Sequence, residues 1–343
     1  MLQNFSEKNL VKIIKEDIDY IQNKNKSSKK NDDLWTSRAN DNFKKIFETD
    51  LDVFLDSFRA NQFFINEYPP FAKNFLSNFI PYKNMVFKNV NKKYDLLNEK
   101  EKYLLKNELI FNHVGNPHFL KKDGVFFNKR WIYNIHYIHL IKTYISEIFN
   151  ANDKIVCDIG GGYGILLYML KKLNFHGTSI LIEFPEQLLT AKYFLKKNFP
   201  NLKINSMKEV YDYKDNFSRA FLKKFDIFLC PIDLFIKIDQ IKLDLIINCF
   251  SLGEMSEQNF QKYINSNLLK NSKYFLSINR IFSKNEYATN IDILDYNYDR
   301  FQKLHFEINK FDIDYVLQYK RYFGFTKKIN SQFVEFIGKK NEK

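Results

Sequence analysis

The sequence predicts an α/β protein built on a mostly parallel sheet with a C-terminal antiparallel hairpin, preceded by a mostly helical region. From Asp153 onward, short apolar runs alternate with segments of helical periodicity, which is typical of strand–helix–strand units. The stretch "VCDIGGGYGILL", residues 156–167, places four of the 10 glycines within five positions, between one such run and a helical segment. We therefore expect a helical region at 1–150 and a sheet-containing domain at 151–343.

The N-terminal region has the apolar spacing of amphipathic helices. One helix is predicted within residues 1–23, where five apolar side chains recur at helical spacing: Leu10, Ile13, Ile14, Ile18 and Ile21. A polar, lysine-rich stretch at 24–34 interrupts the pattern as a linker would. Helical periodicity then dominates 35–149, with a stripe at Leu51, Phe54, Leu55 and Phe58, and prolines in "NEYPPFAKNF" and "NFIPYKN" mark helix breaks.

The C-terminal region contains five candidate buried strands. They are "KIVCDIG", "TSILIEF", "FDIFLCPIDL", "LDLIINCFSL" and "KYFLSINR". Helices are predicted between them at "GILLYMLKKLN", at "PEQLLTAKYFLKKNF", which starts with Pro185 at a favoured first-turn position, and at "SEQNFQKYINSNLL", capped by Ser256. The tail segments "FEINKFDIDYVLQY" and "NSQFVEFIGKK" alternate with period two, as the strands of an antiparallel hairpin do.

Composition narrows the class of protein. Hydrophobic residues make up 45% of the 343 residues, which is enough for a sizeable core. The net charge of +13 comes mainly from dispersed lysines, with only seven arginines, and this favours a solvated surface over a nucleic-acid interface. The start of the chain lacks the apolar segment of a signal peptide, and no apolar run approaches the ~18 residues of a membrane span. We expect a cytoplasmic location.

The three cysteines, Cys157, Cys230 and Cys249, all lie in strand-like runs. Their odd number and wide spacing fit neither a disulfide framework nor a zinc site, so buried reduced thiols are expected.

The glycine cluster has the form of a cofactor-binding turn. Glycines between a strand and a helix allow a ligand to approach the main chain at the helix N-terminus. A dinucleotide fingerprint would need a glycine at Ile165. The pattern Asp158-x-Gly160-x-Gly162-x-Gly164 instead resembles motif I of class I S-adenosylmethionine-dependent methyltransferases, whose fold is Rossmann-like. The resemblance implies S-adenosylmethionine as cofactor, with the turn through Gly161 and Tyr163 against it and Asp158 attracting its ammonium group.

Further candidates follow the other strands, where ligands of open parallel sheets bind. Glu183 ends the second strand and is predicted to accept hydrogen bonds from both ribose hydroxyls. Asp233, after the third strand, is either an adenine contact or a surface carboxylate. The remaining candidates lie where donor and acceptor would meet: Asn248 on the cofactor side, Ser251 and Glu254 after the fourth strand, and Asn279 and Arg280 at the end of the fifth.

Beyond motif I, residues 105–285 resemble a sugar O-methyltransferase family of bacterial polysaccharide biosynthesis. The matching segments are "FNHVGNPH" (111–118), "DIGGGYG", "SLGEM" and "INR". The resemblance implies methyl transfer to a sugar hydroxyl of a nucleotide sugar or a surface-glycan precursor. Position 113, where an acidic residue is expected in many relatives, is His113 here.

A sugar hydroxyl is a weak nucleophile, so a general base is expected to assist methyl transfer. Glu254, His113 and His118 are the candidates, whereas His136 and His139 lie in the aromatic run "WIYNIHYIHLI" and are predicted to be packing residues. No cluster of ligands accompanies Glu254, so no metal is predicted.

Three alternatives remain open. An RNA or DNA methyltransferase would account for the charge, although "NCFS" at the fourth strand differs from the Asp/Asn-Pro-Pro-Tyr motif of amino-methylating nucleic-acid enzymes. A methyltransferase for phenolic or other small molecules is indicated by "IEFPEQL", and a non-enzymatic protein with a degenerate fold is the third. The helical region is predicted to cap the acceptor site or to form a homodimer interface.

Overall fold

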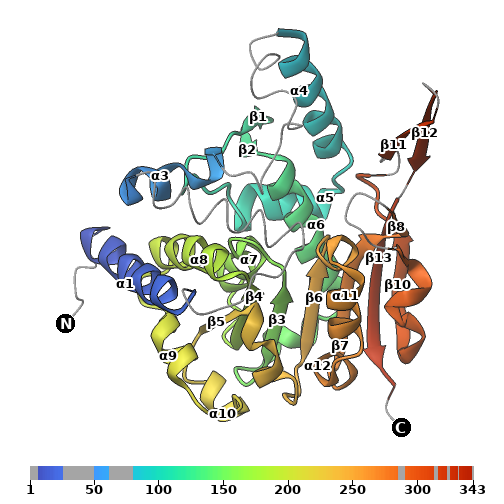
Figure 1. Cartoon of the computed structure of the whole chain (residues 1–343). Coiled ribbons are helices and arrows are strands. Elements are labelled where there is room, and N and C mark those ends of the chain that lie inside the picture. The colour runs from blue at the N-terminus through green and yellow to red at the C-terminus, as the bar shows by residue number, and fades with distance from the viewer. Residues whose placement is uncertain are drawn as a thin grey trace.

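The strands beyond residue 150 form one seven-stranded sheet with the order β10-β13-β7-β6-β3-β4-β5 (Figure 1). The computed structural model describes residues 7–25, 50–61, 80–284, 290–312, 316–322, 325–330 and 332–341. The five predicted strands are β3 (Ile155–Ile159), β4 (Thr178–Glu183), β5 (Ile227–Pro231), β6 (Leu245–Cys249) and β7 (Tyr274–Arg280), and neighbouring members pair in parallel. This confirms the predicted Rossmann-like sheet.

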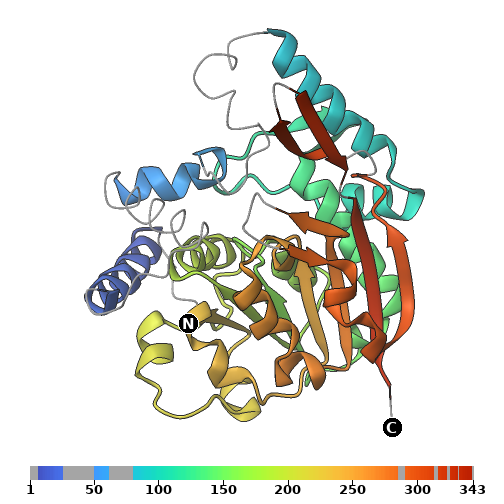
Figure 2. The ribbon, with the colours of Figure 1, turned by 45° about the vertical axis from the view of Figure 1, so that its right-hand side comes forward.

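The antiparallel end of the sheet is formed by β10 (Phe301–Ile308) and β13 (Phe333–Lys340), which come forward at the right in Figure 2. β13 pairs antiparallel with both β7 and β10. The expected hairpin is therefore present, but its first strand starts and ends earlier than the alternation in "FEINKFDIDYVLQY" indicated. The side chain of Asn309 accepts a hydrogen bond from the Phe311 amide at 2.9 Å, and this local turn ends β10. Residues further along form a separate hairpin of β11 (Val316–Tyr322) and β12 (Phe325–Asn330).

Helices cover both faces of the sheet because successive strand residues point to opposite sides. Val156 of β3 contributes to a core shared with α6 (Lys129–Tyr144), α7 (Ile165–Lys172) and α8 (Pro185–Asn198). Cys157 contributes to a second core on the other face. The elements of that face are α9 (Met207–Asp212), α10 (Arg219–Leu222), the 3-10 segment η5 (Ile232–Ile238), α11 (Glu257–Ile264) and α12 (Asn267–Lys270). All three cysteines are free.

The N-terminal helices are α1 (Glu7–Asn25), α3 (Leu51–Asn61), α4 (Ile80–Asp95) and α5 (Glu99–Tyr103), which continues into the π-helical turn η3 (Leu104–Glu108). The predicted stripes are confirmed, since Leu10, Ile14, Ile18 and Ile21 of α1 are buried, as are Leu55 and Phe58 of α3. Pro81 lies in the first turn of α4, whereas Pro69 and Pro70 and most of the predicted linker fall outside the described residues.

The helical region packs directly against the sheet. Buried residues of α1, α3 and α6 belong to the same core as β3 and β6. Lys192 of α8 and Asp17 of α1 form a buried ion pair at 2.5 Å, and Asp17 also accepts a hydrogen bond from the Met207 amide. The division at residue 150 stays a prediction, but the two regions share one core. The helices α3, α4 and α5 lie above the edge where the parallel strands end (Figure 1).

The remaining short elements connect these parts. They are the hairpin β1 (Leu120–Lys122) and β2 (Val125–Phe127), the hairpin β8 (Phe282–Lys284) and β9 (Asn290–Asp292), and the 3-10 segments η4 (Ser146–Asn150), η6 (Leu252–Glu254), η7 (Ile293–Tyr296) and η8 (Tyr298–Arg300). Among the described residues, no helix is both long and apolar enough to cross a bilayer.

Candidate functional site

The glycine-rich turn joins β3 to α7 at the carboxyl edge of the sheet. Gly160, Gly162 and Gly164 have φ values of 72°, 62° and 79°, which side-chain-bearing residues rarely adopt. At two of the glycines, neighbouring protein atoms also leave no room for a side chain. A Cβ on Gly160 would lie 2.2 Å from the Ser251 hydroxyl, and one on Gly161 would lie 2.2 Å from the Asp158 carboxylate. Of the described residues, only Arg130, at 3.2 Å, lies near the corresponding position at Gly162, so the turn is open on this side.

Asp158, the last acidic residue before this turn, is buried with 2% of its surface exposed. Burial raises the pKa of its carboxyl to about 7, the nearby Glu183 adds to the rise, and Arg130 opposes it. A carboxyl group in this state is close to half ionised at neutral pH. It is therefore well suited to a cationic ligand, which would complete its ionisation.

Glu183 ends β4 beside the same turn. Its Oε1 accepts a hydrogen bond from the Gly162 amide at 3.0 Å, and its Oε2 accepts one from the Phe184 amide at 2.8 Å. Burial raises the pKa of Glu183, while these two amide hydrogen bonds and Arg130 oppose the rise. The backbone thus fixes the carboxylate in one orientation. Each oxygen retains a lone pair for a further donor.

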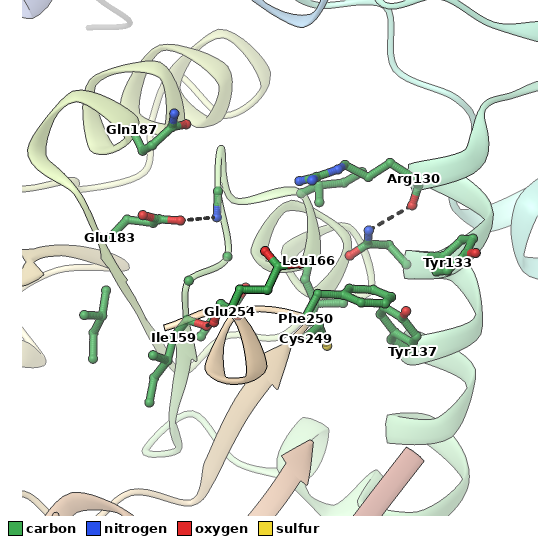
Figure 3. A pocket seen from close by; sticks show the side chains of 18 of the residues that line it. Arg130, Tyr133, Tyr137, Ile159, Leu166, Glu183, Gln187, Cys249, Phe250 and Glu254 are labelled. Atoms are coloured by element: carbon green, nitrogen blue, oxygen red, sulfur yellow. Dashed lines mark hydrogen bonds between the residues drawn. The ribbon is translucent and has the colours of Figure 1, made fainter. Parts of the chain in front are cut away.

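These groups line one cavity of about 390 Å³, within the usual range for small-molecule sites (Figure 3). Eight of the predicted site residues line it: Asp158, Gly160, Gly161, Gly162, Glu183, Ser251, Glu254 and Arg280. In Figure 3, Glu183 and Gln187 lie on one wall, and Arg130, Tyr133 and Tyr137 of α6 lie on the other. The cavity therefore has two sides, separated by the glycine-rich turn and the end of β6.

The α6 wall was not predicted from the sequence. Arg130, Tyr133, Asn134 and Tyr137 are spaced i, i+3, i+4 and i+7, so they share one helix face, and all four line the cavity. That spacing within "KRWIYNIHYIHLIK" was the available signal, but aromatic residues at helical spacing usually belong to a core. Tyr133 also donates to Asp312 at 2.7 Å, and Asp312, which follows β10, lines the cavity as well.

A strained residue marks the end of β6. Phe250 has a φ of 71°, a conformation that costs a non-glycine residue about 1–3 kcal/mol and that is concentrated at functional sites. Its ring lines the cavity and lies 4.6 Å from that of Phe333, centroid to centroid. Behind it, Asn248 is fully buried and does not line the cavity. Its Nδ2 donates to the Ile159 carbonyl at 2.8 Å, and its Oδ1 accepts from Asn279 at 2.9 Å.

Glu254 and Arg280 form the ionic pair of the cavity. Arg280 donates from Nη2 to Glu254 Oε1 at 3.1 Å, and its side chain is only 3% exposed. Glu254 lies in η6 directly after β6, and Arg280 is the last residue of β7. Adjacent parallel strands thus deliver a carboxylate and its cation to the same edge of the sheet.

The other predicted site residues lie outside this lining. His113 and His118 are exposed and lie in the segment that precedes β1. The His113 ring packs against Phe111 and Phe119. Tyr163 is buried against Phe58 and Phe194, and Gly164 starts α7. Asp233 is exposed and accepts a hydrogen bond from Tyr211 at 3.0 Å. Asn279 donates a hydrogen bond to the Asn248 side chain and does not reach the cavity. Their proposed ligand contacts stay predictions.

His136 has more polar partners than a packing residue. Its Nδ1 lies 2.5 Å from Glu101 and its Nε2 lies 2.8 Å from Glu335, so both ring nitrogens face carboxylates. Burial would lower the pKa of His136, but the two carboxylates raise it above its ordinary value. Burial would likewise raise the pKa of Glu101, yet hydrogen bonds from His136 and Lys310 lower it to about 2. These hydrogen bonds connect α6 to α5 and to β13.

Among the residues that the structure describes, no group of three or more His, Cys, Asp or Glu side chains is placed to hold a metal ion.

No protein-family model matches the sequence, and no curated protein matches it either. Solved structures do match. The chain resembles PH1948 from Pyrococcus horikoshii at 15% identity, covering 71% of this chain and 99% of that one, with a TM-score of 0.38. It resembles TehB from Haemophilus influenzae at 14%, covering 64% and 69%, with a TM-score of 0.38. It also resembles magnesium protoporphyrin IX methyltransferase with bound SAM from Synechocystis PCC 6803, at 12%, covering 60% and 79%, with a TM-score of 0.33. Likenesses this distant do not specify an activity, which must come from the site.

Proposed function

We propose that the protein is an S-adenosylmethionine-dependent O-methyltransferase that acts on a sugar hydroxyl of a nucleotide sugar or a surface-glycan precursor. The observation that carries the proposal is the convergence of Asp158, Glu183 and the open side of Gly162 on one cavity. The resemblance of "DIGGGYG" to motif I and of the flanking segments to sugar O-methyltransferases supports the choice of cofactor and acceptor.

The residues present fit the cofactor. Asp158 would hold its ammonium group, and the pKa of about 7 means that the free carboxyl has little else to stabilise its charge. Glu183 would accept from the ribose hydroxyls with the lone pairs that the Gly162 and Phe184 amides leave open. Arg130, which faces Gly162 across the cavity, would pair with the carboxylate of the methionine part. When bound, the cofactor supplies a methyl group on a sulfonium, which is already activated for displacement.

The protein then has to align the acceptor and exclude water. Rings of α6 and of Phe250 and Phe333 line the acceptor side, and they offer flat apolar surfaces to the C–H face of a sugar ring. Glu254 is the proposed general base, since it lines the cavity where the strands end. Arg280 keeps its carboxylate oriented. Glu254 would take the acceptor's proton while the acceptor oxygen displaces the sulfonium sulfur from the methyl carbon, and S-adenosylhomocysteine would be the leaving group.

The same rings support a second candidate, a phenolic or other small aromatic acceptor. Tyr133, Tyr137, Phe250 and Phe333 together would stack on an aromatic ring as readily as on a sugar. Both candidates share the donor side and the base and differ only in the acceptor.

The proposal is tested in two steps. Calorimetric titration should first show S-adenosylmethionine binding, and its absence would remove the proposal altogether. The protein is then incubated with methyl-labelled cofactor and separate acceptors: nucleotide sugars, free sugars, phenols and an oligoribonucleotide. Label in a nucleotide sugar is the expected result. Label in the phenols alone would favour the second candidate, and label in the oligoribonucleotide would contradict both.

A further inference from the structure

Gln187 is a buried polar residue of the cavity that the proposed mechanism does not use. It lies in the first turn of α8, with 4% of its surface exposed. Figure 3 places it beside Glu183, on the wall opposite α6. Its main chain is satisfied, since its amide donates to the Phe184 carbonyl and its carbonyl accepts from the Thr190 hydroxyl. Among the described residues, its side-chain carboxamide makes no hydrogen bond.

A buried amide without partners is unfavourable, so its presence calls for a ligand or a water to satisfy it. The hydroxyls of Tyr137 and Tyr263, two other residues that line the cavity, are sealed from solvent and have no hydrogen-bond partner in the part of the chain that the structure describes. The Gln187 carboxamide differs because neither of its polar atoms is sealed in this way. It is therefore open to whatever the cavity binds.

The position of Gln187 assigns it to the adenosine end of the donor. Asp158 and the turn after β3 would hold the methionine part, and Glu183 at the end of β4 would hold the ribose. The base would then lie beyond the ribose, away from α6 and toward the end of β5. There the cavity is lined by Phe184, Gln187 and Ile232, the last of which follows β5. Two apolar side chains and one carboxamide form a suitable surround for a flat, polar-edged ring.

We propose that Gln187 recognises the edge of the adenine ring, its Oε1 accepting from the exocyclic amine and its Nε2 donating to the adjacent ring nitrogen. The carboxamides of asparagine and glutamine pair with adenine in this bidentate way in protein–nucleic acid contacts. The inference rests on the proposed function for its ligand, and goes beyond it by naming a specificity-determining residue. It also replaces Asp233 as the side chain that distinguishes adenine, because Asp233 is exposed and bonded to Tyr211.

The test compares two ligands and two proteins by calorimetry. The ligands are S-adenosylhomocysteine and its analogue with hydrogen in place of the exocyclic amine. The proteins are the parent and Gln187→Met, which keeps the volume and removes both hydrogen-bonding atoms. The parent should bind S-adenosylhomocysteine about tenfold more tightly than the analogue, and Gln187→Met should bind both with similar affinity. The exposed Gln302→Met serves as the control and should keep the parent's preference.

The outcomes are distinct. No binding of S-adenosylhomocysteine by the parent removes the proposed function, and the inference with it. Binding without a preference in the parent, or an equal preference in Gln187→Met, overturns the inference alone. Should Gln187→Met fail to fold, Gln187→Asn withdraws the carboxamide by one methylene and is expected to lose the preference in the same way.

Discussion

Asp158→Asn is expected to change the pH dependence of stability, because the buried carboxyl holds its proton up to a pH of about 7. Below pH 3.8, both the folded and the unfolded chain carry the proton on Asp158. Between pH 3.8 and about 7, the unfolded chain releases the proton and the folded chain keeps it, so the parent loses stability as the pH rises. Asparagine does not titrate and removes this loss.

The magnitude follows from the two pKa values. The folded-state pKa of about 7 lies roughly 3 pH units above the ordinary aspartate value of 3.8, and each pH unit is worth about 1.4 kcal/mol. The unfolding free energy of Asp158→Asn minus that of the parent should therefore increase by roughly 4 kcal/mol between pH 4 and pH 8. Any fixed cost of burying the amide cancels from this change with pH.

The assay is urea unfolding of both proteins across that pH range, followed by circular dichroism. Asp215→Asn, on an exposed residue, is the control and should track the parent. A difference that stays constant with pH would refute the argument that burial holds the proton on Asp158.

Ligand binding provides the second half of this prediction. The ammonium of S-adenosylhomocysteine should bind the ionised form of Asp158, so the parent's affinity should fall about tenfold per pH unit below pH 7. Asp158→Asn should bind about 100-fold more weakly at pH 8, because a hydrogen bond to a charged group is worth about 1.5–3 kcal/mol, and it should lack this pH dependence. The variant would then gain stability relative to the parent as the pH rises, while it binds the ligand more weakly. That combination separates a functional carboxylate from a structural one.

Three further predictions concern other parts of the molecule. Glu254→Gln should leave cofactor affinity unchanged and slow methyl transfer by about 10²–10⁴-fold, as measured by label incorporation; normal turnover would show that another group takes the proton. His136→Leu should destabilise the fold by about 3–5 kcal/mol, because two buried carboxylates would lose their shared cation. The stabilisation by His136 is full below pH 6.5 and is lost as the pH rises through the raised pKa of His136. Urea unfolding of both proteins between pH 6 and 9 measures this loss. Lys192→Met should be similarly destabilising, whereas Lys192→Met combined with Asp17→Leu should recover most of the loss, and an additive double variant would contradict the pairing.

The sheet was predictable from the sequence because its strands are buried on both faces and therefore form nearly continuous apolar runs. The five strands, the helices α7 and α8 and the cap at Ser256 were confirmed. The single helix predicted at "SEQNFQKYINSNLL" is instead divided into α11 and α12, because Ser266 caps a second helix. The end of the tail strand was not, because it coincides with a local turn in which the Asn309 side chain accepts a hydrogen bond from the Phe311 amide and donates one to Glu335.

The site was only partly predictable. Residues placed by local structure could be predicted, whereas those placed by contacts with residues far away in the sequence could not. Asp158 and Glu183 are fixed by local strand ends, so spacing along the chain places them at the cavity. The partners of His136 are 35 and 199 residues away, and no local pattern indicates them. The left-handed conformation of Phe250 is equally hidden, because the sequence shows a bulky residue where such backbone favours glycine.

The cluster around His136 has a consequence for how this protein can diversify. Helix α6 presents Asn134 and Tyr137 to the cavity, whereas His136 is held by distant carboxylates. Because the hydrogen bonds of His136 involve neither Asn134 nor Tyr137, substitutions at those two positions leave this attachment of the helix intact. A lineage could exchange Asn134 or Tyr137 and so acquire new acceptors, whereas Tyr133 is tied to the buried Asp312 by a hydrogen bond.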